Sequence, residues 1–369
     1  MWHYRAALLG TIALLTFAGT AETGIAQPPP DYGLAWHTVG NPGNPAAQPS
    51  ARFPLLDHSV GQVDYSYRLT ETEITNTQWI EFVDTYSRLH PVPEVINDPG
   101  FAGRDVYRGS DDPTNFDWHA GPQAENAAAV VGWFYAARYC NWLCNGKINA
   151  MWAFESGAYD MSTFHRQPNG TWIGQTVHSA EASYWIPSND EWVKGMYWDP
   201  NKLGQGSGDY WFYPTSSDTL PIGGPPGTPG AQTSAGAWPS PYRYVPVASY
   251  PDASSPWGLL DGSGGAPEYL EGWVENAAFR GSQTREQLYA SVDRLDATID
   301  AVFPTAAIAG LRIASSVPEP GCLVLMCVAG GWIHQSRRRR HEQAYHWRIS
   351  ATNHYGLRDT IQGDDHSLS

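Results

Sequence analysis

The sequence has little cysteine and little charge for its length. Only four of its 369 residues are cysteine, and 16% are charged. Cys322 and Cys327 lie in an apolar run near the C-terminus, whereas Cys140 and Cys144 are one helical turn apart in "ARYCNWLCNG". No disulfide framework is expected from this pattern. A metal site would need more ligands than Cys140 and Cys144 offer, so we interpret them as small buried residues.

Basic residues are also scarce. The chain has 22 Lys and Arg against 37 Asp and Glu, and residues 27–320 carry 15 of the basic and 32 of the acidic ones, a net charge of about −17. A field of this sign repels nucleic acid and anionic membrane surfaces and attracts cations. We therefore expect no nucleic-acid partner.

Several catalytic motifs are missing. No Gly-x-Ser-x-Gly sequence supports a serine hydrolase. The stretch "GSGGA" is not followed by the Gly-Lys-Ser/Thr of a phosphate-binding loop. The 12 histidines show no paired ligand spacing. We interpret five of them as surface or loop residues: His58, His90, His119, His165 and His178.

Aromatic residues, glycine and proline are abundant instead. The 17 Trp and 20 Tyr can build a core, while 37 Gly and 29 Pro indicate a loop-rich fold with short elements. Thr75 with Gln78, and Ser188 with Glu191, have the spacing of helix capping boxes. The expected elements are a strand near 65–72 and helices at 76–88, at 130–145 with Gly146 as its stop, and within 184–198. Residues 199–256 are Gly/Pro/Ser-rich and are expected to be loop. No internal repeat is visible, so the pattern predicts one α+β domain.

Both ends of the chain read as targeting segments. Residues 1–26 combine Arg5, an apolar stretch and small residues before Gln27, as in a secretory signal peptide. A buried first helix is the alternative. Residues 316–340 place an uncharged stretch, 321–333, before four arginines. As a helix this stretch would reach only ~20 Å, short of a ~30 Å bilayer core, but the arginines support a cytoplasm-side stop.

The order of parts in 316–340 resembles the PEP-CTERM sorting signal of bacterial envelope proteins. That resemblance implies an exosortase-type partner and at least transient membrane anchoring through residues 321–333. We interpret 27–52 as a linker and 341–369 as a polar tail without fixed structure. The predicted location is the bacterial cell envelope or the extracellular space.

Four segments of the body, in order, resemble the family of formylglycine-generating, sulfatase-modifying factor domains. They are "TETEITNTQWIEFV", "AAVVGWFYAARYCNWL", "YWIPSNDEWVKG" and "WGLLDGSGGAPEYLEGWV", followed by "FRGSQ" and "AGLRIAS". The resemblance spans residues 53–315. It implies a single α+β domain of the C-type-lectin-like fold, rich in irregular structure and here flanked by signal and anchor helices.

The family's oxygen-dependent chemistry uses two cysteine thiolates that bind copper(I). In the resembled family both cysteines lie between the segments equivalent to "FRGSQ" and "AGLRIAS". Residues 280–312 contain no cysteine, and Cys140 and Cys144 belong to an earlier helix. We therefore predict no catalytic residue and no copper site, and this chemistry is expected to be lost.

The same resemblance implies a calcium ion at "DGSGGAPE". Its ligands would be the side chains of Asp261 and Glu268 and the carbonyl oxygens of Gly264 and Ala266. Calcium takes six to eight oxygens from carboxylates, carbonyls and water, which this stretch can supply. A plain structural turn is the alternative. Asp105, Asp111, Asp112 and Asp117 form a second acidic group, which we interpret as a solvated loop.

Two functions remain open from the sequence. The first is a non-catalytic exported domain that binds a glycan, a peptide or an extracellular polymer. The second is a metal-dependent oxidoreductase of the same family that uses an unrecognised active site. The missing cysteines favour the first.

Overall fold

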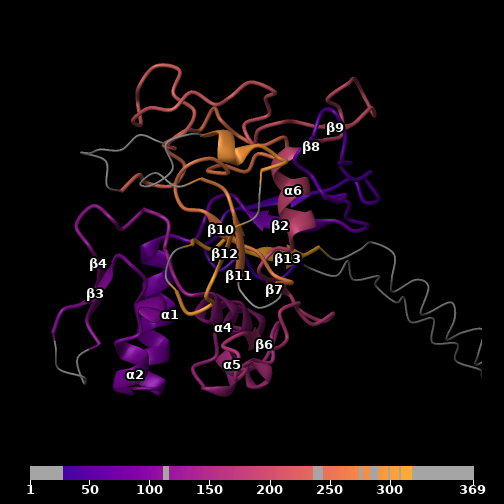
Figure 1. Cartoon of the computed structure of the whole chain (residues 1–369). Coiled ribbons are helices and arrows are strands. Elements are labelled where there is room, and N and C mark those ends of the chain that lie inside the picture. Colours follow the sequence, from indigo (N-terminus) through magenta and orange to yellow (C-terminus); the bar gives the residue numbers. More distant parts are fainter. Residues whose placement is uncertain are drawn as a thin grey trace, which may run out of the picture. The chain divides into compact units, whose positions relative to one another are not determined.

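The structure, a computed structural model, describes residues 28–110, 116–235, 244–273, 277–282, 290–297, 300–306 and 309–317. Short helices and strands are joined by long irregular segments, as Figure 1 shows. Residues 28–317 form one unit. The predicted signal, 1–26, and nearly all of the predicted sorting segment and tail, 316–369, lie outside the described ranges. Within those ranges no helix is long and apolar enough to cross a membrane.

The three predicted helices are present with the predicted caps. Thr75 begins α1 and Ser188 begins α6, each in a complete capping box. Asn145 caps α4, and Gly146 follows with φ of 70°. The α-helices are α1 (Asn76–Leu89), α2 (Pro93–Ile96), α3 (Pro99–Ala102), α4 (Trp133–Cys144), α5 (Trp152–Glu155) and α6 (Asn189–Tyr197). Two 3-10 turns, η1 (Met161–Thr163) and η2 (Ala290–Asp293), complete the helical elements of the described residues.

The described strands form one four-stranded sheet, one three-stranded sheet and three two-stranded pairs, all antiparallel. The four-stranded sheet has the order β1 (Trp36–Val39), β2 (Tyr67–Thr70), β13 (Ala314–Ser316), β7 (Tyr184–Trp185). The three-stranded sheet has the order β10 (Glu268–Tyr269), β11 (Ala277–Arg280), β12 (Asp300–Val302). The pairs are β3 (Val106–Arg108) with β4 (Trp118–Ala120), β5 (His165–Arg166) with β6 (Trp172–Ile173), and β8 (Trp198–Asp199) with β9 (Asp209–Tyr210).

The segment 27–52 is not only a linker. Its strand β1 lies at the edge of the four-stranded sheet and pairs with β2, the strand predicted near 65–72. Arg68 of β2 contacts two residues of this N-terminal segment and holds it against the sheet. Its guanidinium bonds Asp31 at 2.7 Å and lies 4.7 Å from the ring centre of Trp36. The sequence does not predict this strand because the residues around it are rich in Pro and Gly, which indicate loops.

Aromatic side chains fill the core between α1 and α4, which lie side by side in the lower part of Figure 1. Phe82 of α1 is 5.7 Å from Tyr139 and 6.2 Å from Trp142 of α4, measured between ring centres. Phe154 of α5 stacks on Trp142 at 5.7 Å. Offset and edge-on aromatic packing of this kind stabilises beyond the area it buries. The fold thus confirms an α+β domain built on aromatic residues.

Candidate functional site

The turn from Asp261 to Ala266 carries three of the four residues predicted to hold calcium. Asp261 has a left-handed backbone, with φ of 59°, and Gly264 and Gly265 have φ of 84° and 68°. The carboxylate of Asp261 accepts a hydrogen bond from the amide of Ala248 at 2.6 Å. Burial raises the pKa of Asp261 to about 6, against the effect of that hydrogen bond. The turn therefore presents a partly enclosed carboxylate beside glycines in the left-handed conformation.

The fourth predicted ligand, Glu268, lies at the start of β10 and pairs with Arg312. Its Oε1 accepts from Nη2 of Arg312 at 2.8 Å, and its Oε2 accepts from Nε of the same residue at 2.8 Å. Oε2 also accepts from the indole N–H of Trp192 at 2.7 Å. Both charged side chains are fully buried. Losing one partner of such a pair strands the other charge in the core.

Arg312 also holds the surrounding backbone together. It comes from the "AGLRIAS" segment that helped to indicate the family, but nothing in the sequence gave it a partner. Its remaining hydrogen bonds, at 2.6–2.8 Å, go to the carbonyl oxygens of Thr70, Glu71 and Leu260. One guanidinium therefore connects the end of β2, the approach to the turn and β10.

Glu73 is a carboxylate of this site that sequence reasoning missed. It is 1% exposed, and its Oε1 accepts a hydrogen bond from the amide of Ala266 at 3.2 Å. Its Oε2 is buried without a hydrogen-bond partner among the described residues. Burial first, and then the negative charges of Asp261 and Glu268, hold the pKa of Glu73 well above its ordinary value. No local sequence pattern separates Glu73 from the half-exposed Glu71 in "TETEITN".

The electrostatics of the site leave room for a cation. If ionised, Asp261, Glu73 and Glu268 carry three negative charges, and Arg312 supplies one positive charge in return. The described residues contain no group of three or more His, Cys, Asp or Glu placed to share a metal ion. A metal here would therefore use one or two carboxylates together with backbone carbonyls, a donor set that suits calcium. Glu73 keeps one carboxylate oxygen without a hydrogen-bond partner among the described residues, whereas three N–H donors already engage Glu268.

Of the two cysteines of α4, Cys140 is buried as expected, whereas Cys144 is half-buried. Cys140 is fully buried, and Cys144 bonds the backbone of Tyr184 through its sulfur at 3.3–3.4 Å. Burial raises the pKa of both thiols, and each therefore stays protonated at neutral pH. A protonated thiol is a weak nucleophile and a weak metal ligand.

The second acidic group is not a uniformly solvated loop. Asp105 is 6% exposed and accepts a hydrogen bond from the hydroxyl of Tyr244 at 2.7 Å, so the expectation of solvation is wrong for this residue. Asp117 is exposed, as expected, at the edge of β4. Asp111 and Asp112 lie outside the described residues. The acids do not form one site in the described part of the chain.

One of the five histidines lies in a loop, as expected, but makes specific side-chain contacts. His178 lies in an irregular segment, but its ring stacks on Trp185 with centres 4.4 Å apart, and Nδ1 is 2.8 Å from the carboxylate of Glu271. Glu271 also accepts from the hydroxyl of Tyr159 at 2.9 Å. The His178–Glu271 contact and the stacking on Trp185 hold the segment around His178 against β7. His58, His119 and His165 are exposed and His90 is half-buried, as expected.

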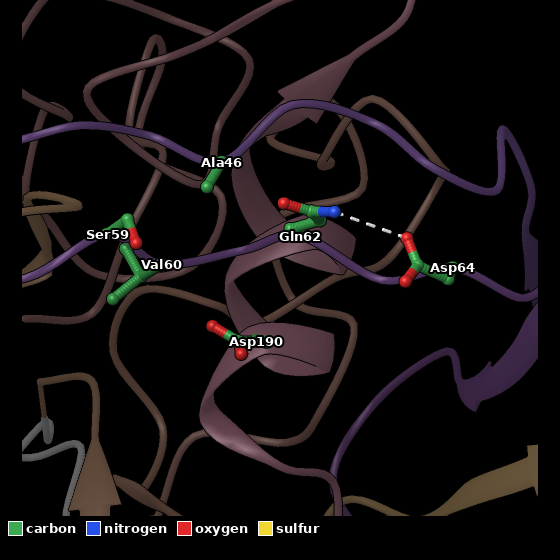
Figure 2. A pocket seen from close by; sticks show the side chains of 6 residues that line it. All are labelled: Ala46, Ser59, Val60, Gln62, Asp64 and Asp190. Atoms are coloured by element: carbon green, nitrogen blue, oxygen red, sulfur yellow. Dashed lines mark hydrogen bonds between the residues drawn. The ribbon is translucent and has the colours of Figure 1, made fainter.

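Two surface cavities are alternative sites. One, of about 270 Å³, is formed where the N-terminal segment crosses α6, and Figure 2 shows Asp190 of α6 beneath Val60 and Gln62. Its lining residues are Ala46, Ser59, Val60, Gln62, Asp64 and Asp190. Gln62 donates to Asp64 at 3.3 Å. The cavity has no aromatic wall and is smaller than ordinary ligand pockets, which begin at ~300 Å³.

The other cavity has a volume of about 400 Å³ and lies between two loops. Residues 227–232 form one side and residues 249–253 the other. Tyr250 is one of its lining residues, and its hydroxyl donates to the carbonyl of Gly224 at 2.7 Å. Its walls mix apolar and polar groups, and it contains no pair of groups arranged for catalysis among the described residues.

Comparison with known proteins agrees with the motif order. The model of the sulfatase-modifying factor enzyme 1-like domain matches residues 45–361. No curated protein matches the chain. Among solved structures, Treponema denticola variable protein 1 is similar over 76% of this chain and 94% of that chain, with 13% identity and a TM-score of 0.41. At these values nothing is carried over from that structure.

Proposed function

The chain belongs to the family of sulfatase-modifying factor enzyme 1-like domains, and on this premise we propose that it is a non-catalytic member that acts as a binding or structural module at the cell surface. The family match covers most of the chain, including the stretch where the resembled enzymes have their catalytic cysteines. This chain differs from the resembled enzymes because it lacks their cysteine pair in that stretch.

The number and position of the cysteines is the observation that supports the proposal most directly. Residues 280–312 contain no cysteine, so no thiolate pair can form where the family's copper chemistry takes place. Cys140 and Cys144 do not replace it, because both lie in α4 with thiol pKa values raised by burial. Copper(I) needs accessible, deprotonated sulfur.

The two ends of the sequence support an exported, envelope-sorted protein. The signal-like residues 1–26 and the PEP-CTERM-like residues 316–340 suit export, exosortase-type processing and transient anchoring through 321–333. The strongly acidic body suits an environment without nucleic acid. An extracellular polymer or glycan is the partner class that fits such a location.

A structural calcium ion at the turn 261–268 is the second part of the proposal. Asp261, Glu268 and the carbonyls of Gly264 and Ala266 are the residues that the family resemblance implies. The buried carboxyl groups around this turn support it, because a divalent cation would favour their ionised forms. Its role would be to brace a domain that has few regular elements.

An aldehyde assay tests the absence of catalysis. The full-length chain would be incubated with copper and a cysteine-containing sulfatase peptide, and we expect no aldehyde above the level seen without protein. Aldehyde formation that depends on the protein would contradict the proposal and favour the alternative, a metal-dependent oxidoreductase. A Cys140→Ser, Cys144→Ser double variant is the control, because loss of aldehyde in it would trace the activity to α4.

A further inference from the structure

Glu268 is poorly available to a cation at the turn 261–266. Its carboxylate receives two N–H bonds from Arg312 and one from Trp192, all between 2.7 and 2.8 Å. A metal ion bound to Glu268 would have to compete with a fixed, bidentate guanidinium, which is among the stronger carboxylate partners. The positive charge that Glu268 needs is therefore already supplied by the protein.

Glu73, in contrast to Glu268, has a carboxylate oxygen without a hydrogen-bond partner among the described residues. It is 1% exposed, and it comes from the segment between β2 and α1, which packs against the turn. Oε1 is fixed by the amide of Ala266, while Oε2 has no hydrogen-bond partner among the described residues. A buried carboxylate oxygen without a partner costs free energy unless something meets it.

The turn is shaped to admit this carboxylate. A Cβ added to Gly265 would lie 2.6 Å from Oε1 and 3.9 Å from Oε2 of Glu73. Gly265 also has φ of 68°, a conformation that favours glycine. The glycine at this position thus lets the backbone lie directly against Glu73. The unmet oxygen is thus the farther of the two from Gly265, but still lies next to the turn that carries Asp261.

We propose that Glu73 and Asp261, rather than Glu268 and Asp261, supply the two carboxylates of the calcium site, with carbonyl oxygens of the turn completing it. This inference rests on the proposed calcium ion and reassigns one of its ligands. Glu268 then serves as the fixed partner of Arg312. Calcium is favoured over magnesium because two carboxylates and irregular backbone suit its flexible coordination, whereas magnesium demands a nearly ideal octahedron.

Calcium titration of the full-length chain and of three variants tests the proposal. The proteins are stripped with a chelator, and heat of calcium binding and the calcium-induced rise in Tm are measured. In Glu73→Gln the calcium affinity should fall by about 10-fold or more, because one charged ligand is lost. Its Tm in chelator should not fall below that of the parent, because Gln keeps the acceptor for Ala266 and never carries the charge that burial disfavours there.

The other two variants show whether a lower calcium affinity comes from loss of a ligand or only from loss of a nearby negative charge. Glu71→Gln removes one charge from a half-exposed side chain close to the same turn, and should bind calcium within about 3-fold of the parent. Glu268→Gln should melt at a lower temperature with and without calcium, but keep its calcium affinity. If Glu268→Gln does not fold, the comparison of Glu73→Gln with Glu71→Gln still decides the ligand.

The outcomes are distinct. Unchanged calcium affinity in Glu73→Gln, or equal losses in Glu73→Gln and Glu71→Gln, would overturn the assignment of Glu73. Absence of any calcium binding by the parent would overturn both the assignment and the calcium ion itself. Neither result bears on catalysis, which the aldehyde assay measures separately.

Discussion

Asp293 is a buried carboxylic acid surrounded by hydroxyl groups. Oδ2 accepts from the hydroxyls of Ser263 at 2.6 Å and Ser282 at 2.7 Å, and Oδ1 accepts from the amide of Ser282 at 2.6 Å. These hydrogen bonds favour the ionised form, but burial dominates and raises the pKa of Asp293 to about 7. The residue therefore binds a proton in the folded chain at a pH where it is ionised in the unfolded chain.

This difference predicts a pH dependence of stability. Between the unfolded pKa, ~3.9, and the folded value, about 7, the folded state holds a proton that the unfolded state lacks. The free energy of unfolding should therefore fall as the pH rises through this window, by at most ~1.4 kcal/mol per pH unit from this group. In Asp293→Asn that part of the slope should vanish, and the variant should gain stability relative to the parent from pH 5 to pH 8.

Urea denaturation of both proteins at pH 5 and pH 8 measures the effect. Asp261, whose pKa is raised to about 6 by burial, contributes a slope of the same sign in both proteins and cancels in the comparison. Equal pH slopes for the parent and Asp293→Asn would show that Asp293 ionises normally in the folded chain.

At the scale of elements, helix α6 is fixed at its start by two reciprocal hydrogen bonds. The hydroxyl of Ser188 accepts from the amide of Glu191 at 3.2 Å, and the Glu191 carboxylate accepts from the amide of Ser188 at 2.7 Å. The same carboxylate accepts from the indole of Trp185 and the hydroxyl of Tyr65. The capping residue Glu191 thus connects the start of α6 to Trp185 of β7 and to Tyr65, which precedes β2.

Removing the cap hydroxyl should be measurable. Ser188→Ala is expected to lower the free energy of unfolding by about 1 kcal/mol, because one orphan amide of α6 loses its acceptor. Thr85→Ala, on the outer face of α1, is the matched control and should change it by less than about 0.5 kcal/mol. Urea midpoints of the two variants provide the measurement, and equal shifts would contradict a specific role for the cap.

At the scale of the whole molecule, the N-terminal segment belongs to the domain although it reads as a linker. Val39 is fully buried and Leu34 is 8% exposed, and β1 supplies one edge of the four-stranded sheet. Asp31 and Trp36 both contact Arg68, a buried cation of β2. Without them the guanidinium would lose its ion pair and its aromatic neighbour.

Truncation tests how much this segment contributes. A chain that starts at residue 41 should lose more than about 3 kcal/mol of stability relative to one that starts at residue 28, since two apolar side chains and the partners of Arg68 are removed. Calorimetric melting of both chains gives the comparison. Equal Tm values would mean that β1 adds nothing to the fold.

The sequence by itself determined the elements that obey local rules, and the family. Helices α1, α4 and α6 follow from hydrophobic periodicity, from Thr75 and Ser188 as caps, and from Gly146 as a stop, all signals within a few residues of the element. The order of the four resembling segments was enough to indicate the family, because it depends only on position along the chain. The missing cysteines could likewise be counted in the sequence.

Only the tertiary structure decided how the acidic residues are used. Glu73 meets Ala266 across 193 residues of chain, and Arg312 meets Glu268 across 44. No local pattern distinguishes Glu73, buried at the turn, from the half-exposed Glu71 two residues earlier. Burial and charge pairing depend on which distant segments fold together, and these two properties decide which carboxylate is free to hold a cation.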